Sequence, residues 1–342
     1  MIEVQTAARL HLGLLDNNGE LGRLYGSIGL AVDRPKILLR ASPCDGLRVE
    51  GPERERVALY ARRFIGAFGF PRGARLELIS AIPAHVGLGS GTQLALAVGS
   101  ALARLARRRL PARLIALAVG RGWHSGVGIT TFQYGGFVLD GGRRIASGRA
   151  GARRLDRSGI PPVLFRQPMP KSWYFVLAIP ETDPGLSGKR EADAFTRLPA
   201  APPALVGAIS RVLLIQMLPA LVERDAAEFG RALTRIQCMV GDCFASVQGG
   251  RFASPAARDM VDCMLASGAA GIGQSSWGPA VYGLVEGRAG ARRLFETARS
   301  RLDALGGGRV LLVRPRNCGA RIREPDGPGR VSPGPGGAQG AV

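Results

Sequence analysis

The sequence predicts an α+β protein made of two domains. Its 342 residues are enough to bury two hydrophobic cores, and a hydrophobic content of 46% argues against global disorder. Strand-like segments in the first half are followed by helix-like segments, without the strict alternation of a parallel sheet. Prolines at 168 and 170 precede a new apolar strand. We therefore expect one domain at residues 1–166 and another at residues 167–324.

In the first domain, alternating hydrophobicity predicts strands and a 3.6-residue period predicts helices. The Asp16-Asn17-Asn18-Gly19 segment is typical of a hairpin turn. Two short strands are expected on either side of Pro35. The expected strands are residues 4–15, 28–32, 37–41, 75–82 and 135–140, and the expected helices are 57–68, 93–105 and 111–119.

The second domain has the same mixture of elements, and its first helix is expected to bend near Pro219. Residues 325–342 are rich in proline and glycine and lack hydrophobic periodicity, which predicts a disordered tail. The expected strands of this domain are residues 173–179, 280–285 and 309–313, and the expected helices are 205–222, 226–240, 255–266 and 289–305.

The formal net charge of +20 comes almost entirely from arginine, because the chain has only three lysines. The arginine clusters are short and scattered, unlike the continuous basic stripe with aromatic residues that is typical of a nucleic-acid binder. A positive surface also attracts small anions toward a cleft. We therefore expect small anionic substrates and no nucleic acid as partners.

The sequence also predicts a cytoplasmic protein that does not enter a membrane. Its five cysteines are scattered and form no CxxC pair, so neither a zinc site nor a disulfide framework is indicated. The first residues lack the basic and apolar regions of a signal peptide. The chain contains no run of 18 or more apolar residues, so no membrane span is predicted.

The most informative segment is residues 83–92, which read Pro-Ala-His-Val-Gly-Leu-Gly-Ser-Gly-Thr. Glycines at alternate positions let backbone N–H groups approach an anion closely. The N-terminus of the following helix would add partial positive charge and unpaired N–H groups. A glycine-rich turn before a core helix has the same pattern. The phosphate-binding residues expected here are Gly87, Leu88, Gly89, Ser90, Gly91 and Thr92.

Two further glycine-rich segments follow in the chain. The first contains Ser125-Gly126-Val127-Gly128 and then Gly135-Gly136, and the second spans residues 271–279. In this order and at these separations, the three segments resemble the GHMP superfamily, named for its galactose, homoserine, mevalonate and phosphomevalonate kinases. The resemblance implies a two-domain GHMP-kinase-like fold, with an N-terminal ribosomal-protein-S5-like domain and a C-terminal α+β ferredoxin-like domain. It adds Ser125 and Gly126 to the phosphate-binding candidates, and its C-terminal glycine motif falls on Gly273, Ser275 and Ser276.

Position 128 departs from the kinase pattern. In many GHMP kinases the middle segment reads Ser-Gly-x-Asp, and the aspartate serves the attacking hydroxyl, whereas this chain has Gly128. Glycine cannot accept a proton, so the kinase mechanism loses a central group. Further segments resemble the β-ribofuranosylaminobenzene 5′-phosphate synthase family, among them Arg9-Leu10-His11-Leu12-Gly13-Leu14-Leu15-Asp16 and Ser275-Ser276-Trp277-Gly278-Pro279.

This second resemblance implies that 4-aminobenzoate condenses with 5-phosphoribosyl diphosphate, releasing diphosphate and CO₂, as a step of tetrahydromethanopterin biosynthesis. Fixed donors and a divalent cation would stabilise the departing diphosphate, so Mg²⁺ is an expected cofactor. A homodimer is also implied, with the apolar helix at 205–218 as a candidate interface. Two rival functions remain open: an ATP-dependent GHMP small-molecule kinase, and a basic RNA-binding module with salt-sensitive binding.

Two aspartates lie beside glycines at the ends of expected strands. Asp16 is a candidate metal ligand and Asp140 a candidate catalytic carboxylate, although a turn aspartate that bonds its own backbone has the same pattern. His11, in the first strand, is a further catalytic candidate. Lys189 is another, because it follows a glycine-rich segment that could close over a phosphate.

The benzoate needs its own binding groups. Arg9 and Arg23 are expected to bind the substrate carboxylate, because a guanidinium group can pair with a carboxylate through two hydrogen bonds. Trp277 is expected either to stack on the ring or to pack in the core.

Overall fold

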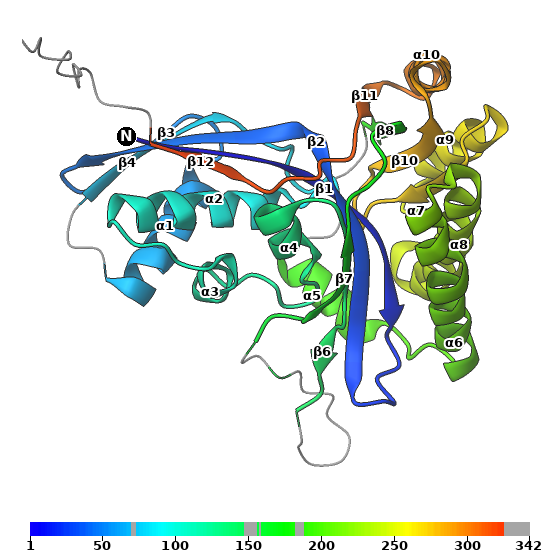
Figure 1. Cartoon of the computed structure of the whole chain (residues 1–342), viewed down its shortest axis with the longest axis horizontal. Helices are drawn as coiled ribbons and strands as arrows, with labels where there is room; N and C mark the ends of the chain where they lie inside the picture. The colour runs from blue at the N-terminus through cyan, green and yellow to red at the C-terminus, as the bar shows by residue number, and fades with distance from the viewer. Residues whose placement is uncertain (70–72, 147–155, 157–158, 182–187, 325–342) are drawn as a thin grey trace, which may run out of the picture.

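Two antiparallel-rich sheets and the helices packed on them form the protein (Figure 1). A computed structural model describes residues 1–69, 73–146, 156, 159–181 and 188–324. The predicted α+β class is confirmed, and the tail expected at 325–342 lies outside the described residues.

The first sheet is built on one long hairpin. Strands β1 (Ile2–Asp16) and β2 (Arg23–Cys44) pair antiparallel across the predicted turn. The remaining strands of this sheet are β3 (Leu47–Glu50), β4 (Gly73–Ser80), β5 (Phe137–Asp140), β6 (Arg143–Arg144), β7 (Val163–Gln167) and β12 (Arg321–Arg323).

The prediction of two separate strands around Pro35 is wrong. Both segments belong to β2, and Pro35 lies where β2 bulges away from its partner. Ala7 faces Lys36 while Arg9 faces Ala31, so the intervening residues of β2 have no partner on β1. Residues 32–35 of β2 pair with no residue of β1, so the missing N–H of Pro35 does not interrupt the pairing of these two strands.

Four helices cover one face of the first sheet: α1 (Arg54–Phe68), α2 (Ser90–Leu105), α3 (Ala112–Ala118) and α4 (Val127–Tyr134). The central helix, α2, is buried along nearly its whole length, as its apolar sequence requires. Its N-terminus is therefore held rigidly at the end of the glycine-rich loop.

The second sheet has the order β11-β8-β10-β9. Its strands are β8 (Trp173–Pro180), β9 (Gly271–Gln274), β10 (Val281–Glu286) and β11 (Gly308–Val313). The helices of this half are α5 (Gly188–Arg197), α6 (Pro203–Val212), α7 (Leu218–Glu223), α8 (Ala226–Gln248), α9 (Pro255–Ala266) and α10 (Arg288–Ala304). Near Pro219, where a bend was expected, a π-helical turn, η1 (Leu213–Met217), joins α6 to α7, and Pro219 lies in the first turn of α7.

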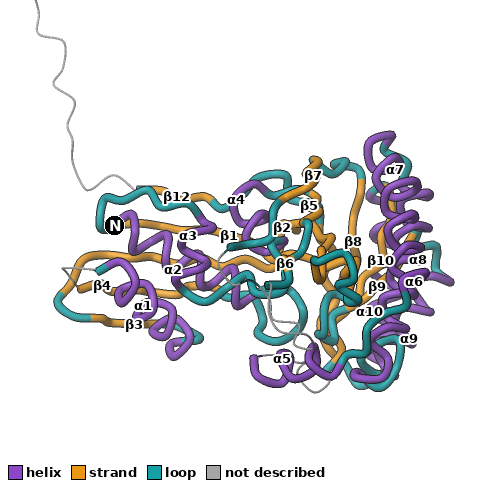
Figure 2. Tube along the Cα trace, turned by 90° about the horizontal axis from the view of Figure 1, so that it is seen from below, coloured by secondary structure: helices purple, strands orange, loops and turns teal. Residues whose placement is uncertain are grey.

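The two halves are joined by more than their linker. β1 and β2 run past the helices of the first domain toward α8 (Figures 1 and 2). There the Gln237 side chain of α8 donates a 2.6 Å hydrogen bond to the carbonyl of Leu12 in β1. At the other end of the chain, β12 returns to pair with β1. Residues 321–323, expected in the second domain, are thus part of the first sheet.

One described helical run, Pro203–Glu223, is long and apolar enough by composition to cross a membrane, and 28% of its most apolar window is buried. Its buried side chains, among them Ile209 and Met217, face the hydrophobic core that also contains α8. Leu214 and Ile215 on the opposite side are exposed.

Candidate active site

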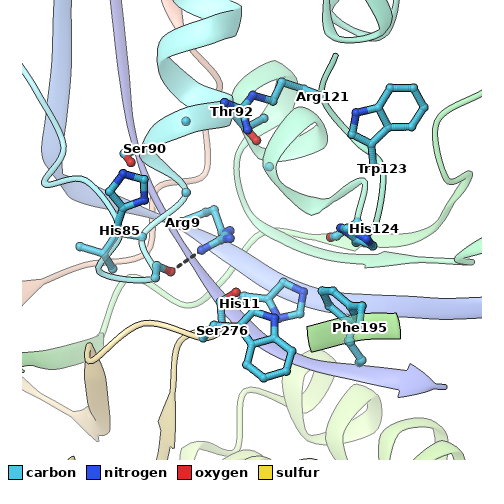
Figure 3. A pocket seen from close by; sticks show the side chains of 18 of the residues that line it. Arg9, His11, His85, Ser90, Thr92, Arg121, Trp123, His124, Phe195 and Ser276 are labelled. Carbon is cyan, nitrogen blue, oxygen red and sulfur yellow. Dashed lines mark hydrogen bonds between the residues drawn. The ribbon is translucent and has the colours of Figure 1, made fainter. Parts of the chain in front are cut away.

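A cavity of about 750 Å³ lies where the two halves meet. Its described lining comes from β1, α1, the glycine-rich loop and the start of α2, the segment that leads into α4, β6, α5, α8, and the end of β9 with the residues after it. Figure 3 shows that Arg9, His85 and Ser90 lie at one side of this cavity, and that His124 and Phe195 lie at another.

The predicted phosphate loop forms one wall. Gly87 and Gly89 have φ angles of 88° and 75°, a conformation that side chains strongly disfavour, and His85 shares it at 60°. A Cβ atom on Gly87 would lie 2.0 Å from the carbonyl oxygen of Ser275. Helix α2 begins at Ser90 without a side-chain capping hydrogen bond. Its first amides are therefore suited to bind an anion in the cavity.

The C-terminal glycine motif supports this loop from behind. The Ser275 hydroxyl donates to the Gly87 carbonyl over 2.7 Å and accepts from the His11 N–H over 3.0 Å. Ser276 lines the cavity directly. Gly273 lies in β9, where a Cβ atom would meet the Tyr282 hydroxyl at 2.5 Å and the Gln237 side chain at 2.6 Å. The motif therefore contributes mainly by packing the second domain against the loop.

Arg9 and His11 both reach the cavity from β1. The Arg9 guanidinium donates to the Gly87 carbonyl and lies against Gly89 (Figure 3). Burial, and then the charge of Arg9, lower the pKa of His11 from 6.5 to about 3. The imidazole is thus neutral near pH 7, because its charged form would be poorly solvated beside another cation.

Asp140 is completely buried and lies behind the cavity wall. One carboxylate oxygen accepts from the Gly126 N–H at 2.8 Å and from the Ser125 hydroxyl at 3.3 Å, and the other accepts from the Gly142 N–H at 2.9 Å. Burial raises the pKa of Asp140 from 3.8 to about 6, and these hydrogen bonds oppose that rise. Ser125 lines the cavity, so Asp140 is placed to fix the segment that contains Ser125 and Gly126.

Two other predicted residues, Asp16 and Arg23, lie outside the described cavity lining. Asp16 accepts from the N–H groups of Asn18 and Gly19, at 2.6 Å and 2.9 Å, which is the turn geometry that the sequence left open. Arg23 donates to the carbonyls of Gly141 and Gly142, and neither Arg23 nor Asp16 is among the described cavity residues. Lys189 lies in α5, and its side chain is outside the described part of the structure.

Aromatic rings gather at one end of the cavity. His124 stacks on Phe195 with ring centres 4.3 Å apart, and Trp277 meets Phe195 and Phe244 edge to face. Trp277 was singled out from the sequence. Phe195 was not, because α5 was not predicted as a helix. Its short amphipathic pattern, Gly188–Arg197, was the available signal.

Arginine dominates the charge of the cavity. Six arginines line it, and no aspartate or glutamate does so among the described residues. Of these, only Arg9 was predicted from the sequence as a site residue; the others are Arg56, Arg63, Arg121, Arg143 and Arg251. Arg56, Leu59 and Arg63 share one face of α1, a spacing that the sequence does show.

Among the described residues, the cavity offers no carboxylate that could hold the expected Mg²⁺. Protein-bound Mg²⁺ prefers one or two carboxylates, and the described lining offers guanidinium, imidazole, hydroxyl and amide groups instead. No cluster of three or more histidine, cysteine, aspartate or glutamate residues with metal-binding geometry occurs in the described residues. The described donor set therefore does not fit a Mg²⁺ ion held by protein carboxylates.

Gly128 lies in the first turn of α4 and lines the cavity. A Cβ atom there would lie 3.1 Å from the Thr92 methyl group of the phosphate loop. The position at which many GHMP kinases carry their aspartate thus faces the loop directly, and here it supplies no carboxylate.

The GHMP class is supported by direct comparison. A model of the GHMP kinases N-terminal domain matches residues 55–136, and a model of the GHMP kinases C-terminal region matches residues 217–304. Homoserine kinase from Cytophaga hutchinsonii superposes with a TM-score of 0.65 at 20% identity, covering 94% of this chain and 97% of that one. Mevalonate kinase from Methanococcus jannaschii gives 0.62 at 14% identity, covering 93% and 98%. Fold and loop together define a GHMP-type protein.

Closer relatives identify the family. The chain is 35% identical to the β-ribofuranosylphenol 5′-phosphate synthase of Methanothermobacter thermautotrophicus, over 93% of this chain and 97% of the relative. It is 38% identical to the enzyme of the same name from Archaeoglobus fulgidus, over 85% and 90%. The chain belongs to the β-ribofuranosylphenol 5′-phosphate synthase family.

This membership confirms the predicted synthase resemblance and makes the protein an enzyme with small-molecule substrates. It favours neither the RNA-binding module nor the kinase. The relatives' name contains a phenol, whereas the resemblance in the sequence implied an aminobenzene.

Proposed function

We propose that this protein transfers the 5-phosphoribosyl group of phosphoribosyl diphosphate to the ring carbon that bears the carboxylate of 4-aminobenzoate or its 4-hydroxy analogue. A bond forms between that carbon and ribose C1, and the bond from C1 to diphosphate breaks. The bond between the ring and its carboxylate then breaks, CO₂ leaves, and its electron pair returns to the ring. The reaction written in this way needs no external oxidant and no base.

One observation carries the proposal: a single cavity joins a phosphate loop to an aromatic cluster. Diphosphate departure concentrates negative charge on the leaving oxygens, and loop amides near guanidinium groups stabilise such charge. The stacked rings of His124 and Phe195 offer a surface for the benzoate. Holding the ring over ribose C1 would supply the orientation that the reaction needs.

Arg9 is proposed to bind the substrate carboxylate, as the sequence suggested. The carboxylate sits on the carbon that attacks C1, so it must approach the diphosphate closely. Arg9 lies against Gly89 at the edge of the loop, where a group could meet both anions. A neutral His11 beside it can exchange hydrogen bonds without adding charge, which keeps the carboxylate from being stabilised too strongly to leave.

Magnesium is proposed to accompany the substrate rather than to occupy a carboxylate site. Phosphate oxygens are its preferred partners when few protein carboxylates are available. Asp140 lies behind the cavity lining and is proposed to position Ser125 and Gly126 through its hydrogen bonds to them. The catalytic role of Lys189 stays a prediction from the sequence.

The test uses the full chain with phosphoribosyl diphosphate, MgCl₂ and benzoates labelled in the carboxyl group. We expect release of labelled CO₂ and of diphosphate in equal amounts, and parallel reactions with 4-aminobenzoate and 4-hydroxybenzoate identify the aryl substrate. ATP consumption with a small alcohol, without CO₂ release from either benzoate, would instead support the kinase.

A homodimer in the cytoplasm is the proposed working form. Leu214, Ile215 and Val222 are exposed along Pro203–Glu223 by 55%, 73% and 56%, and a second copy would cover them. Light scattering should give twice the mass of the chain, and Ile215→Glu should give the monomer. A monomeric wild-type protein at assay concentration would contradict this assembly.

A further inference from the structure

Arg121 lies against the start of α2 on the side away from Arg9 (Figure 3). A Cβ atom on Gly91 would meet the Arg121 guanidinium at 3.0 Å, just as one on Gly89 would meet the Arg9 side chain at 3.0 Å. Glycine at both positions therefore admits a guanidinium group to each flank of the loop.

The backbone on both sides of Arg121 directs its side chain toward the cavity. Gly120 and Gly122 have φ angles of 72° and 85°, so the chain turns sharply on both sides of Arg121. The Arg121 N–H donates to the Ala116 carbonyl at 2.7 Å, which closes the end of α3. The side chain thus leaves a well-defined turn and enters the cavity.

Helix α1 holds the residue in place. The Arg121 guanidinium donates to the hydroxyl of the buried Tyr60 and lies over the Tyr60 ring, 5.0 Å from its centre. Three residues further along α1, Arg63 donates over 3.1 Å to the Val119 carbonyl, close to Arg121 in the chain. Both contacts come from one side of α1, so the helix fixes the side chain and the backbone together.

We propose that Arg121 binds a phosphoryl group of the phosphoribosyl substrate at the N-terminus of α2, opposite Arg9. This inference rests on the proposed function and adds a substrate-binding residue to it. The guanidinium presents parallel N–H donors that match phosphoryl oxygens, and the helix N-terminus adds amides and partial positive charge. The anion is either the leaving diphosphate or the 5′-phosphate, which share this chemistry.

The experiment measures binding of inorganic pyrophosphate and of ribose 5-phosphate to the full chain by calorimetry. Arg121→Gln should weaken one of them about 10- to 100-fold, the loss expected for a charge-assisted hydrogen bond. Weakened pyrophosphate binding assigns Arg121 to the leaving group, and weakened ribose 5-phosphate binding assigns it to the 5′-phosphate. Arg62→Gln is the matched control, because Arg62 is an exposed arginine of α1, the helix that anchors Arg121, and does not line the cavity.

The proposal is overturned if Arg121→Gln binds both ligands within about twofold of the wild type. If Arg121→Gln does not fold, Arg121→Lys and Tyr60→Phe replace it. Lysine keeps the charge without the parallel donors, and phenylalanine removes only the anchoring hydroxyl. Each should weaken binding to an intermediate degree, and wild-type affinity in both overturns the proposal.

If the proposed synthase activity were wrong, the assays would give a different pattern of results. In that case the wild-type protein would release no labelled CO₂ from either benzoate, whatever its affinity for pyrophosphate. A wild type that turns over, together with an Arg121→Gln variant that keeps its affinity for both anions and its KM for phosphoribosyl diphosphate, would refute the role of Arg121 alone.

Discussion

Replacing Ser275 with alanine should loosen the junction between the two halves of the protein. The Ser275 side chain is fully buried, and its hydroxyl bonds to a carbonyl of the phosphate loop and to an N–H of β1. After the change, the Gly87 carbonyl still accepts from Arg9, but the His11 N–H loses the partner that the hydroxyl supplied.

The expected loss follows from these two contacts. A neutral hydrogen bond contributes about 1 kcal/mol and a buried unsatisfied donor costs about 1–3 kcal/mol, so the free energy of unfolding should fall by about 2–4 kcal/mol. With an unfolding entropy of about 2.1 cal/mol/K per residue, a loss of about 3 kcal/mol lowers the melting temperature by about 4 °C in a chain of this length.

Urea denaturation followed by circular dichroism measures this loss, and calorimetry with pyrophosphate measures its effect on the loop. Ser267→Ala is the control, because Ser267 is exposed at the end of α9 in the same half of the protein. It should change stability by less than about 0.5 kcal/mol. The reasoning is refuted if Ser275→Ala is as stable as this control.

Three further changes test the site. Burial raises the pKa of Asp140 from 3.8 to about 6, so between these values the folded protein keeps a proton that the unfolded chain has released, and this residue makes stability fall as pH rises. Asp140→Asn should remove that slope from urea midpoints measured across the same range, and an unchanged slope would show that Asp140 does not titrate there. Gly128→Asp should bind pyrophosphate about tenfold more weakly than Gly128→Asn, because it adds a negative charge beside Thr92 in an anion site; equal affinities would contradict this. Phe195→Leu should raise the KM for the benzoate about three- to tenfold without changing that for phosphoribosyl diphosphate, because it removes the ring stacked on His124. A rise in the second KM instead would place Phe195 near the phosphates.

The glycine-rich loop and the helix behind it could be predicted because their signal is local. The alternation of glycines, the apolar helix behind them and the left-handed conformations at Gly87 and Gly89 all belong to one short segment. Helix α9 was predicted with its observed ends for the same reason, since Ser254 caps it and Pro255 opens it.

Other roles depend on contacts between distant segments. Asp16 and Asp140 have the same local pattern, and each accepts from an N–H of its own turn, but Asp140 also bonds Ser125, fifteen residues earlier. The glycines on both sides of Arg121 are a weak local signal, and its contacts with Tyr60 and Gly91 are what place it at the loop. Aromatic contacts hold α5 at the cavity, and these too are absent from its sequence pattern.

The return of the chain end to β1 has a consequence for chimeric enzymes. Residues 314–320 bond to β2 and α4, and β12 then pairs beside the first residues of the protein. A hybrid that takes everything after residue 167 from a relative would therefore insert a foreign strand into the native sheet. Exchanging residues 168–313 while keeping the native ends would leave each sheet with strands from a single parent.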